Sequence, residues 1–343
     1  HDDVRNADIR IWVNGILKPR AEATVSVFDS GFVLGDGVWE GFRVLAGQPA
    51  FLDAHLDRLY EGAKAIALDI GMSRGEMKQA IADTVKANGM RDEVHIRLMV
   101  TRGIKRTPYQ DPRACIGQAT VVIIPEYKTP KPETLQAGLK LFTVHVRRGF
   151  PDVQDPKLNS HSKLNCITAC IQAIAAGADE GLMLDPHGFV ATCNSTHFFI
   201  VRKGEVWTST GDYCLGGITR ANVIALCRQN GIPCFEKNFS LSQVYGADEA
   251  FCTGTFAGVV PVREIDGRVI GENIDHGQAV ATSHLVVIEV VGGGDFHHAG
   301  AEFAVHGRVG DDRNLRGGPE RAPHHFSDPT GITGILGVHR DGD

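Results

Sequence analysis

One segment of the sequence has the features of a candidate anion site at the start of an expected helix. Gly216 and Gly217 precede Ile218 and Thr219, and an apolar periodicity typical of a helix continues to about Asn230. The backbone N–H groups in the first turn of a helix have no partner within it, and the helix dipole places partial positive charge there. With Thr219 as the expected cap, this segment favours an anion such as phosphate.

Cysteine and histidine residues predict no metal site. The eight cysteines are scattered and include no Cys-x-x-Cys pair, whereas zinc sites need ligands clustered at short spacing. Cys166 and Cys170 share one face of an expected helix, as small core residues often do. Scattered thiols in a chain of this size are typical of a reducing compartment, so we expect a cytoplasmic protein.

The overall composition argues against two classes of partner. The chain has 343 residues, 43% of them hydrophobic, and a formal net charge of −6. Mild acidity without a basic stripe argues against nucleic acid. No apolar run approaches the roughly 18 residues of a membrane helix, and no secretory signal is visible. At roughly 100–200 residues per domain, this length suggests two domains.

The first part of the chain predicts a smaller N-terminal α/β domain, residues 1–128. Asp53 is expected to cap a helix with one buried stripe, and Ser73 with Glu76 predicts a capping box on the next helix. Residues 25–44 are interpreted as strands joined by glycine-rich turns. The other strands expected here are the two arms of a hairpin around Asn14-Gly15 within residues 9–18, residues 94–100 and residues 119–124.

Residues 129–134 are the expected linker, because three prolines fall within residues 125–134. A larger C-terminal domain, residues 135–272, follows. Its expected elements are strands at 138–146 and 180–184, hairpins at Lys203-Gly204 and Asp266-Gly267, and helices at 165–176 and from Thr219 to about Asn230.

The last segment, residues 273–343, differs in character. Residues 292–343 contain 12 glycines and 6 histidines, and no lysine occurs after Lys237. Poor periodicity in such a composition predicts a disordered or badly packed tail. The segment is either a natural extension or a non-native reading frame, and we favour the second interpretation.

Several ordered segments together resemble the class IV (fold type IV) aminotransferases that use pyridoxal 5'-phosphate (PLP), specifically the branched-chain and D-amino-acid group. The resemblance covers roughly residues 9–271 and rests on WVNG, FDSGFVLGDGVWEGFRV, HLDRL, HIRL, GADEGLMLD, GITR, ADEAFCTGT and PVREIDG. It implies a mixed α/β (α+β) fold with the two-domain D-amino-acid aminotransferase-like architecture. It also implies a homodimer with the cofactor cleft between the domains.

The resemblance assigns two groups of binding residues. For the cofactor phosphate these are Arg58, Ile218, Thr219 and Thr255, and the guanidinium fork of arginine suits phosphate oxygens. An exposed arginine on an amphipathic helix is the alternative for Arg58. The substrate side is assigned Arg97, near a substrate carboxylate or in a cross-strand ion pair, with His95, Phe32 and Trp39 lining the pocket or the core.

The sequence departs from the family at the lysine that forms the covalent Schiff base with the cofactor. The family pattern places Asn159 at that position, and an amide cannot form this bond. Lys157 lies two residues earlier and Lys163 four residues later. Each can instead be an ordinary solvated lysine, and Lys163 is favoured because Lys163-Leu164-Asn165 resembles the family's K-x-L-N.

A second departure concerns the pyridine nitrogen of the cofactor. Thr192 occupies the position of the family's glutamate, and His197 a position where asparagine is common. A hydroxyl can hydrogen-bond to the ring but cannot hold its charge, which makes the ring a poorer electron sink.

Three functions remain open on this reading. The first is PLP-dependent transfer of an amino group between an amino acid or amine and a 2-oxo acid, with Lys163 or Lys157 as the reactive amine. The second is a ligand-binding or regulatory protein that has lost Schiff-base chemistry. The third is a lyase similar to the aminodeoxychorismate enzymes.

Overall fold

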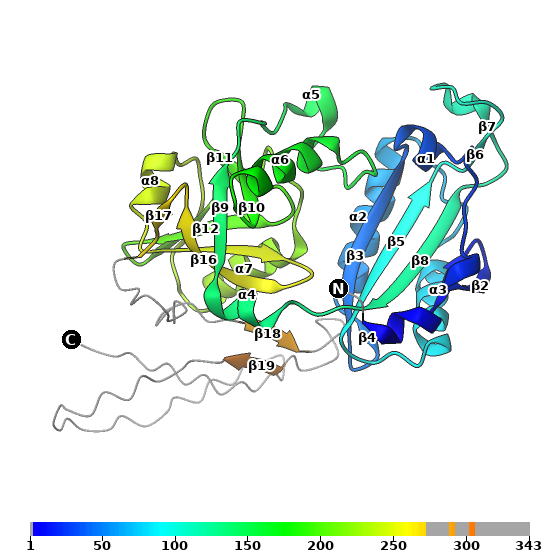
Figure 1. Cartoon of the computed structure of the whole chain (residues 1–343), viewed down its shortest axis with the longest axis horizontal. Helices are drawn as coiled ribbons and strands as arrows, with labels where there is room; N and C mark the ends of the chain where they lie inside the picture. Colours follow the sequence, from blue (N-terminus) through cyan, green and yellow to red (C-terminus); the bar gives the residue numbers. More distant parts are fainter. Residues whose placement is uncertain (1–2, 272–287, 292–301, 306–343) are drawn as a thin grey trace.

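The computed structural model describes residues 3–271, together with the backbone of residues 288–291 and 302–305. Two sheets lie side by side, one built from the first part of the chain and one from the second (Figure 1). The expected mixture of helix and sheet is therefore confirmed. No helix in the described part of the chain has the length and apolarity needed to span a membrane.

The first sheet has six strands, all paired antiparallel, in the order β2-β1-β8-β5-β3-β4. Asn14 and Gly15 have φ values of 48° and 91° and make the tight turn of the first hairpin, as predicted. The strands are β1 (Arg10–Val13), β2 (Ile16–Pro19), β3 (Gly37–Leu45), β4 (Gln48–Pro49), β5 (Val94–Thr101) and β8 (Thr120–Tyr127). A separate short hairpin consists of β6 (Ile104–Lys105) and β7 (Cys115–Ile116).

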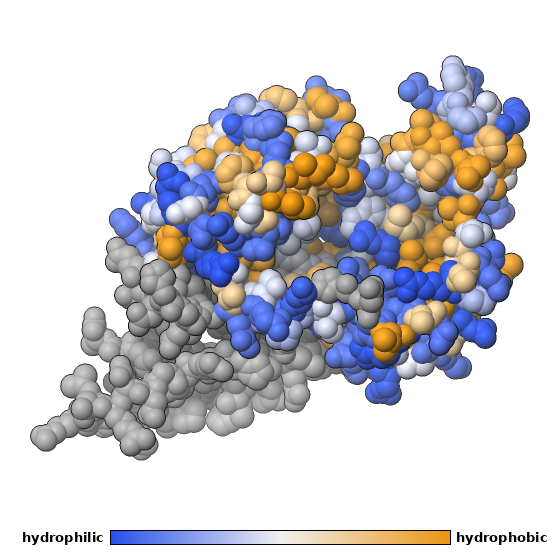
Figure 2. Space-filling view, viewed as in Figure 1, coloured by the Kyte–Doolittle hydropathy of each residue, from blue (hydrophilic) through white to orange (hydrophobic). Residues whose placement is uncertain are grey.

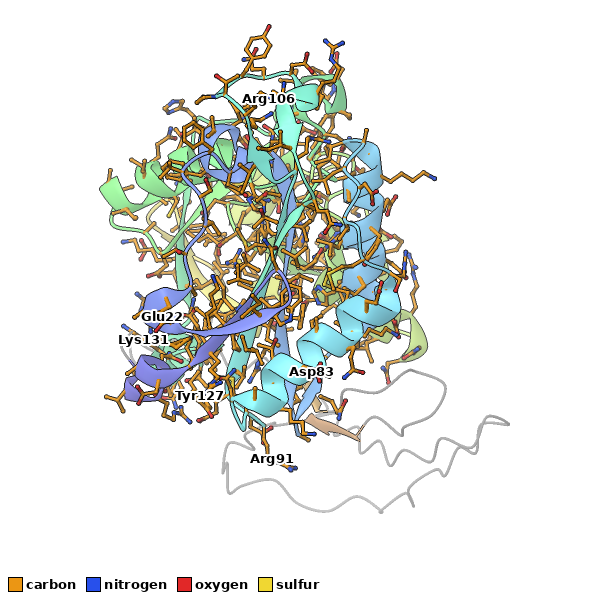
Figure 3. The ribbon with its side chains drawn as sticks, turned by 90° about the vertical axis from the view of Figure 1, so that its right-hand side faces the viewer. Glu22, Asp83, Arg91, Arg106, Tyr127 and Lys131 are labelled. Atoms are coloured by element: carbon orange, nitrogen blue, oxygen red, sulfur yellow. The ribbon has the colours of Figure 1, made fainter. Side chains whose placement is uncertain are left out.

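Helices α2 (Leu52–Ala65) and α3 (Arg74–Ala87) cover one face of this sheet, as the side view in Figure 3 shows, where Asp83 marks α3. Leu56, Leu59 and Ile81 pack there against buried side chains of β3 and β5. The capping box of Ser73 with Glu76 is confirmed. The remaining short elements are α1 (Ser30–Leu34), η1 (Val4–Asp8), η2 (Arg20–Glu22) and η3 (Pro112–Ala114).

Two local predictions in this part are wrong. The cap of α2 is Phe51, whose left-handed backbone (φ 51°) turns the chain into the helix, while Asp53 lies in the first turn and pairs with Lys78. Residues 25–44 include the helix α1, because the Asp29 side chain accepts a hydrogen bond from the Gly31 amide and so begins a helical turn.

The second sheet is mixed and runs β11-β10-β9-β16-β15-β12-β13-β14, with β17 paired to β16. Its strands are β9 (Leu139–Thr143), β10 (Glu180–Leu184), β11 (Val190–Cys193), β12 (His197–Arg202), β13 (Glu205–Thr208), β14 (Cys234–Glu236), β15 (Glu249–Gly254), β16 (Gly258–Ile265) and β17 (Arg268–Val269). Both predicted hairpins, at Lys203-Gly204 and at Asp266-Gly267, are present.

Helices cover both faces of the second sheet. On one face, α6 (Leu164–Ala175) packs through Ala169 against Met183, and α7 (Ile218–Gln229) packs through Val223 and Ile224. On the other face, α8 (Leu241–Tyr245) contributes Val244 to the largest core of this part. Two short helices, α4 (Pro132–Ala137) and α5 (Pro151–Gln154), complete the set.

The passage between the sheets falls at residues 128–131, between β8 and α4. The proposed division into domains at residues 1–128, 129–134 and 135–272 stays a prediction. Most of residues 273–343 lie outside the described residues, as does the prediction made for them. Within that range, the backbone of β18 (Ile288–Val291) pairs antiparallel with that of β19 (Glu302–Val305).

Candidate active site

Lys163 is the N-cap residue of α6 and is half-buried, between residues of the first sheet and residues of the second. Its Nζ donates a hydrogen bond to the Oδ1 atom of Asn159 at 3.0 Å and lies 5.2 Å from the centroid of the Trp39 ring. The backbone of Lys163 lies at the positive end of the helix dipole, because the first turn of α6 begins at Leu164.

Asn159 is anchored to the first sheet. The backbone N–H of Trp39 donates to the Asn159 carbonyl at 2.9 Å, and the Asn159 side-chain amide donates to the Trp39 carbonyl at 2.7 Å. His161 N donates to the Gly37 carbonyl at 2.9 Å, and the Trp39 indole N–H donates to the Ser160 carbonyl at 3.0 Å. These bonds join residues 159–161 to β3 and fix the point from which Lys163 extends.

Arg97 and Lys163 both lie near the ring of Trp39. Its guanidinium carbon lies 3.8 Å from the ring centroid, a favourable cation–π distance. Burial lowers the pKa of Arg97, whereas Glu126 and Glu40 act in the opposite direction. Among the described residues Arg97 forms no ion pair, so the cross-strand pair considered above is absent there and the guanidinium is left for another anion.

Positive charges converge on Lys163. Burial lowers the pKa of its amine to about 8, and Arg148, Arg58 and Arg97 lower it further, while Cys166 opposes the shift. A lysine with such a pKa has a substantial neutral fraction near neutral pH, and the neutral amine is the nucleophilic form.

We expect the acylation of Lys163 to rise with pH through a midpoint near 8. The neutral amine reacts and the ammonium does not, so the rate increases as pH rises through the pKa of Lys163. Competitive labelling with trace acetic anhydride from pH 6 to 11, read by peptide mass spectrometry, measures this midpoint, with exposed Lys64 as the reference. A midpoint at or above 10 for Lys163 would contradict the effect of burial.

The opposite side of the site contains Arg58, on α2. Its Nε and Nη2 atoms donate to the two carboxylate oxygens of Glu40, each at 2.7 Å, and Nη1 donates to the Gly216 carbonyl at 2.6 Å. The side chain is only 15% exposed, so the alternative of a freely solvated arginine is excluded. Arg58, on α2, therefore links this helix and the first sheet to the loop directly before α7.

The prediction that Thr219 caps α7 is wrong, because the cap lies two residues earlier. The N-cap is Gly217, without any side-chain hydrogen bond to the first turn, and Ile218 is the first helical residue. A glycine is required there, since a Cβ atom on Gly217 would collide with the ring of His197. The first amides of α7 consequently have no capping side chain and are available to an anion.

His197 lies beneath this turn and is exposed to the same positive field. Burial lowers its pKa to about 3, and Arg220, Arg58, Lys157 and Arg148 lower it further. Arg58 and Arg148 thus help to lower the pKa of both His197 and Lys163. The neutral ring of His197 at ordinary pH can donate or accept a hydrogen bond, depending on the tautomer.

Thr192 and Thr255 both belong to the second sheet or the turns that join its strands. Thr192 is buried on β11, and its hydroxyl donates to the Thr196 carbonyl at 2.8 Å, which leaves only its oxygen lone pairs for another group. Thr255 is half-buried in the turn between β15 and β16, two residues after Thr253, which pairs with His197 across the strands.

The remaining predicted residues lie in different environments. Lys157 is exposed and its Nζ donates to the Gly211 carbonyl, away from Asn159. His95 packs edge-on against Phe256 at 5.7 Å, and burial, helped by Arg97, lowers its pKa to about 3. Phe32 is 73% exposed on α1, and its place in a substrate pocket stays a prediction.

Sequence reasoning missed three residues of this arrangement. Glu40 accepts hydrogen bonds from Arg58 within the core, and His55 bonds to Glu40. Arg148 donates from Nη1 at 2.9 Å to Oδ1 of Asn165, two residues after Lys163. A glutamate in the middle of the apolar strand at 37–45 was a detectable signal for the first. Nothing in the local sequence around Arg148 distinguishes it from an ordinary surface arginine.

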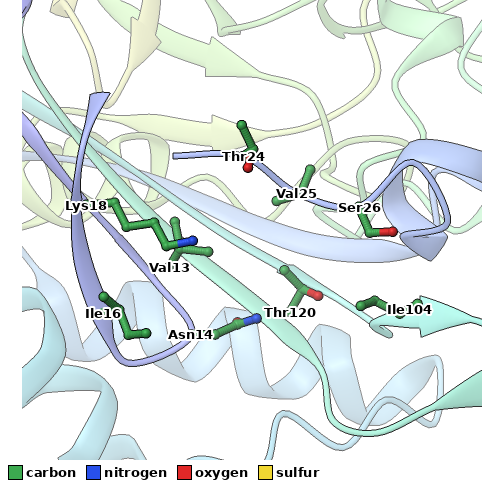
Figure 4. Close-up of a pocket in the computed structure, with 9 residues that line it drawn as sticks. All are labelled: Val13, Asn14, Ile16, Lys18, Thr24, Val25, Ser26, Ile104 and Thr120. Atoms are coloured by element: carbon green, nitrogen blue, oxygen red, sulfur yellow. The ribbon is translucent and has the colours of Figure 1, made fainter. Parts of the chain in front are cut away.

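A cavity of about 220 Å³ lies elsewhere, between the β1–β2 hairpin and residues 24–26 (Figure 4). Its apolar lining residues are Val13, Ile16, Val25 and Ile104, and Lys18 and Thr120 are among the polar ones. None of the predicted site residues lines this cavity, so it is separate from the lysine site.

Comparison with known proteins points to the same family as the sequence motifs. The model of the family described as amino-transferase class IV matches residues 37–265. A putative branched-chain-amino-acid aminotransferase of Methanocaldococcus jannaschii is 42% identical over 264 residues, which cover 76% of this chain and 90% of that protein. The branched-chain-amino-acid aminotransferase-like protein 2 of Arabidopsis thaliana is 43% identical over 267 residues.

The Arabidopsis match covers 78% of this chain but 48% of the relative, so the chain spans about half the length of that protein. Among solved structures, the branched-chain aminotransferase of the thermophilic archaeon Thermoproteus uzoniensis, crystallised with norvaline, superposes with a TM-score of 0.71 at 33% identity. The match covers 78% of this chain and 90% of that one. The expected architecture is thereby confirmed.

Proposed function

The chain belongs to the class IV aminotransferase family, and from this premise we propose that it transfers an amino group between an amino acid or amine and a 2-oxo acid with PLP as cofactor. The observation that carries the proposal is the position of Lys163. A half-buried amine with a pKa lowered to about 8, bonded to Asn159 and surrounded by arginines, is suited to covalent chemistry with an aldehyde.

The residues present fit the phosphate of PLP. By donor count, Arg58 has two N–H groups left after its bonds to Glu40 and Gly216, one on each terminal nitrogen. The uncapped first turn of α7 offers the amides of Ile218 and Thr219. Thr255 is the proposed third contact, and the positive field felt by His197 suits a dianion.

The residues present also fit the aldehyde end of PLP, although they differ from those of the family pattern. Lys163 takes the place of the lysine that the family pattern puts at position 159, and Asn159 orients its amine by accepting one N–H. When bound, PLP supplies an electron sink at the substrate's α-carbon. Lys163 then holds and returns the proton at that carbon, while Thr192 offers oxygen lone pairs to the ring nitrogen without a negative charge.

The substrate side is proposed to be Arg97 above Trp39, with His95 behind them. Arg97 would bind the carboxylate that amino acids and 2-oxo acids share, and the Trp39 ring holds its guanidinium in place. The 3.8 Å stack and the 5.2 Å distance from the same ring to Lys163 bring the anion site and the amine together.

We also propose that the chain forms a homodimer through α6. Apolar side chains at helical spacing are strongly exposed along it, and Figure 2 shows apolar residues gathered over this part of the molecule. They are Leu164 (71% exposed), Ile167 (51%), Ile171 (59%) and Ile174 (65%). A contiguous apolar patch of this kind marks an interface. The eight free cysteines support the proposed cytoplasmic location.

The substitution Ile171→Asp should convert a dimer of this chain to a monomer. A carboxylate at the centre of the stripe would be buried without a partner in the dimer and solvated in the monomer. Light scattering coupled to size-exclusion chromatography measures the mass, with the exposed Val153→Asp variant as the control. A mass that is the same for wild type and Ile171→Asp would contradict the assignment of α6 to the interface.

The experiment that tests the function uses the absorption spectrum of the purified protein after PLP is added, before and after borohydride. A visible band converted to a fixed adduct that maps to Lys163 supports the transaminase, as does transfer of an amino group to a 2-oxo acid. An adduct on Lys157 would assign the reactive amine there. PLP binding without an adduct would instead favour a ligand-binding protein, and pyruvate release without an acceptor would favour the lyase.

A further inference from the structure

Glu40 is a carboxylate with no access to solvent. It lies on the helix-facing side of β3, between Val38 and Phe42, and its side chain is 0% exposed. A buried carboxylate is costly unless paired and hydrogen-bonded. Burial would raise the pKa of Glu40, but hydrogen bonds from Arg58 and His55 outweigh it and leave the pKa below its ordinary value.

His55 completes the arrangement. Its Nδ1 atom lies 2.7 Å from Oε2 of Glu40, while its Nε2 atom is buried without a hydrogen-bond partner in the described part of the chain. The tautomer with its proton on Nδ1 therefore donates to Glu40 and leaves only a lone pair on Nε2. The ring is fully buried beside Phe42, 5.4 Å away, so it can hold the carboxylate in one orientation.

The two oxygens of Glu40 occupy one edge of the Arg58 guanidinium completely. Nε and Nη2 donate to them in the parallel, bidentate geometry that fixes the plane of the group. Nη1 contributes a third bond, to the carbonyl of Gly216, directly before the N-cap of α7. The remaining N–H groups are thus held in a fixed plane next to the helix start rather than distributed over arginine's many rotamers.

We propose that Glu40 and His55 are positioning residues that preorganise Arg58 as the phosphate-binding group, so that the core of the first sheet sets the affinity for the cofactor's phosphate. The inference rests on the proposed function in one respect, the use of a phosphate-bearing cofactor. Glu40 touches no ligand itself. Its effect on binding passes through Arg58, and it is specific for the phosphate end.

The test compares two probes, PLP and pyridoxal, which share the ring and aldehyde and differ in the phosphate. Their dissociation constants are measured by equilibrium dialysis on the full chain without cofactor. Glu40→Gln is expected to weaken PLP binding by roughly 10- to 100-fold, the range for one or two hydrogen bonds to a charged group, and to leave pyridoxal binding unchanged. The matched control is Glu249→Gln, on β15, which should change neither.

A double-mutant cycle separates positioning from a general structural role. In the Arg58→Ala background, Glu40→Gln should cause no further loss of PLP affinity, because the group through which it acts is gone. Thermal unfolding of each variant reports folding. If Glu40→Gln does not fold, His55→Leu, which removes one of three donors to Glu40, should show a smaller loss with the same preference for PLP over pyridoxal.

Equal weakening of both probes by Glu40→Gln, or further weakening in the Arg58→Ala background, would overturn the inference. So would unchanged PLP binding in Arg58→Ala. These results differ from failure of the proposed function. Wild-type binding of PLP without an adduct would contradict the transaminase and leave the inference standing, whereas wild-type binding of neither probe would overturn both.

Discussion

Lys163→Met is expected to eliminate the borohydride-fixed adduct with PLP and to lower the rate of amino transfer by at least about 10³-fold, the size of a lost nucleophile and proton carrier. The variant should still bind PLP, because Arg58 and the first turn of α7 remain intact. Methionine suits the half-buried position beside Trp39, so the fold should be retained. Adduct formation is measured by mass spectrometry and transfer by product formation from a 2-oxo acid.

The matched control is Lys157→Met, which removes a nearby exposed amine bonded to the Gly211 carbonyl. This variant should keep both the adduct and most of the rate. The assignment to Lys163 is wrong if Lys163→Met keeps its adduct and Lys157→Met loses it.

Arg97→Met should lower kcat/KM for carboxylate-bearing substrates by about 10²- to 10³-fold, the effect of removing one member of a buried charge pair. Arg97 is half-buried, forms no ion pair with the described residues and is held over the Trp39 ring at 3.8 Å. A substrate carboxylate would supply the missing counter-charge. Steady-state rates over a range of amino acid and 2-oxo acid concentrations measure the loss.

Two comparisons test whether the loss of kcat/KM reflects substrate binding and not cofactor binding. Arg97→Lys keeps the charge but loses the planar fork and its stacking, so it should recover only part of kcat/KM. PLP affinity should be the same in both variants as in wild type. A similar loss for PLP and for substrate would place Arg97 in the cofactor pocket instead.

Much of the fold was predictable because periodicity and turn chemistry are local. The capping box at Ser73, the Asn14-Gly15 turn and the alternation along residues 94–100 each appear in the structure as expected. The cap of α2 was missed because Phe51 adopts a left-handed backbone that its residue type disfavours.

The site was only partly predictable, because its key relations join distant residues. The motif around residue 159 indicated that the usual lysine is absent and left a displaced or a lost lysine open, and only the structure shows the Lys163 amine bonded to Asn159 while Lys157 bonds to Gly211. Likewise, the strand glutamate at position 40 becomes informative only once His55 and Arg58 are seen to surround it. The roles of these residues in catalysis stay predictions.

The hydrogen bonds of Trp39, on β3, with Asn159 and Ser160 connect positions 120 and 121 residues apart in the chain. Contacts across such a separation carry a large loop-closure entropy and form late in folding. The amine of Lys163 therefore reaches its final surroundings only after both sheets have formed and the chain between them has closed. In a refolding experiment, secondary structure should return first, and the capacity to react at Lys163 should return with the slowest phase.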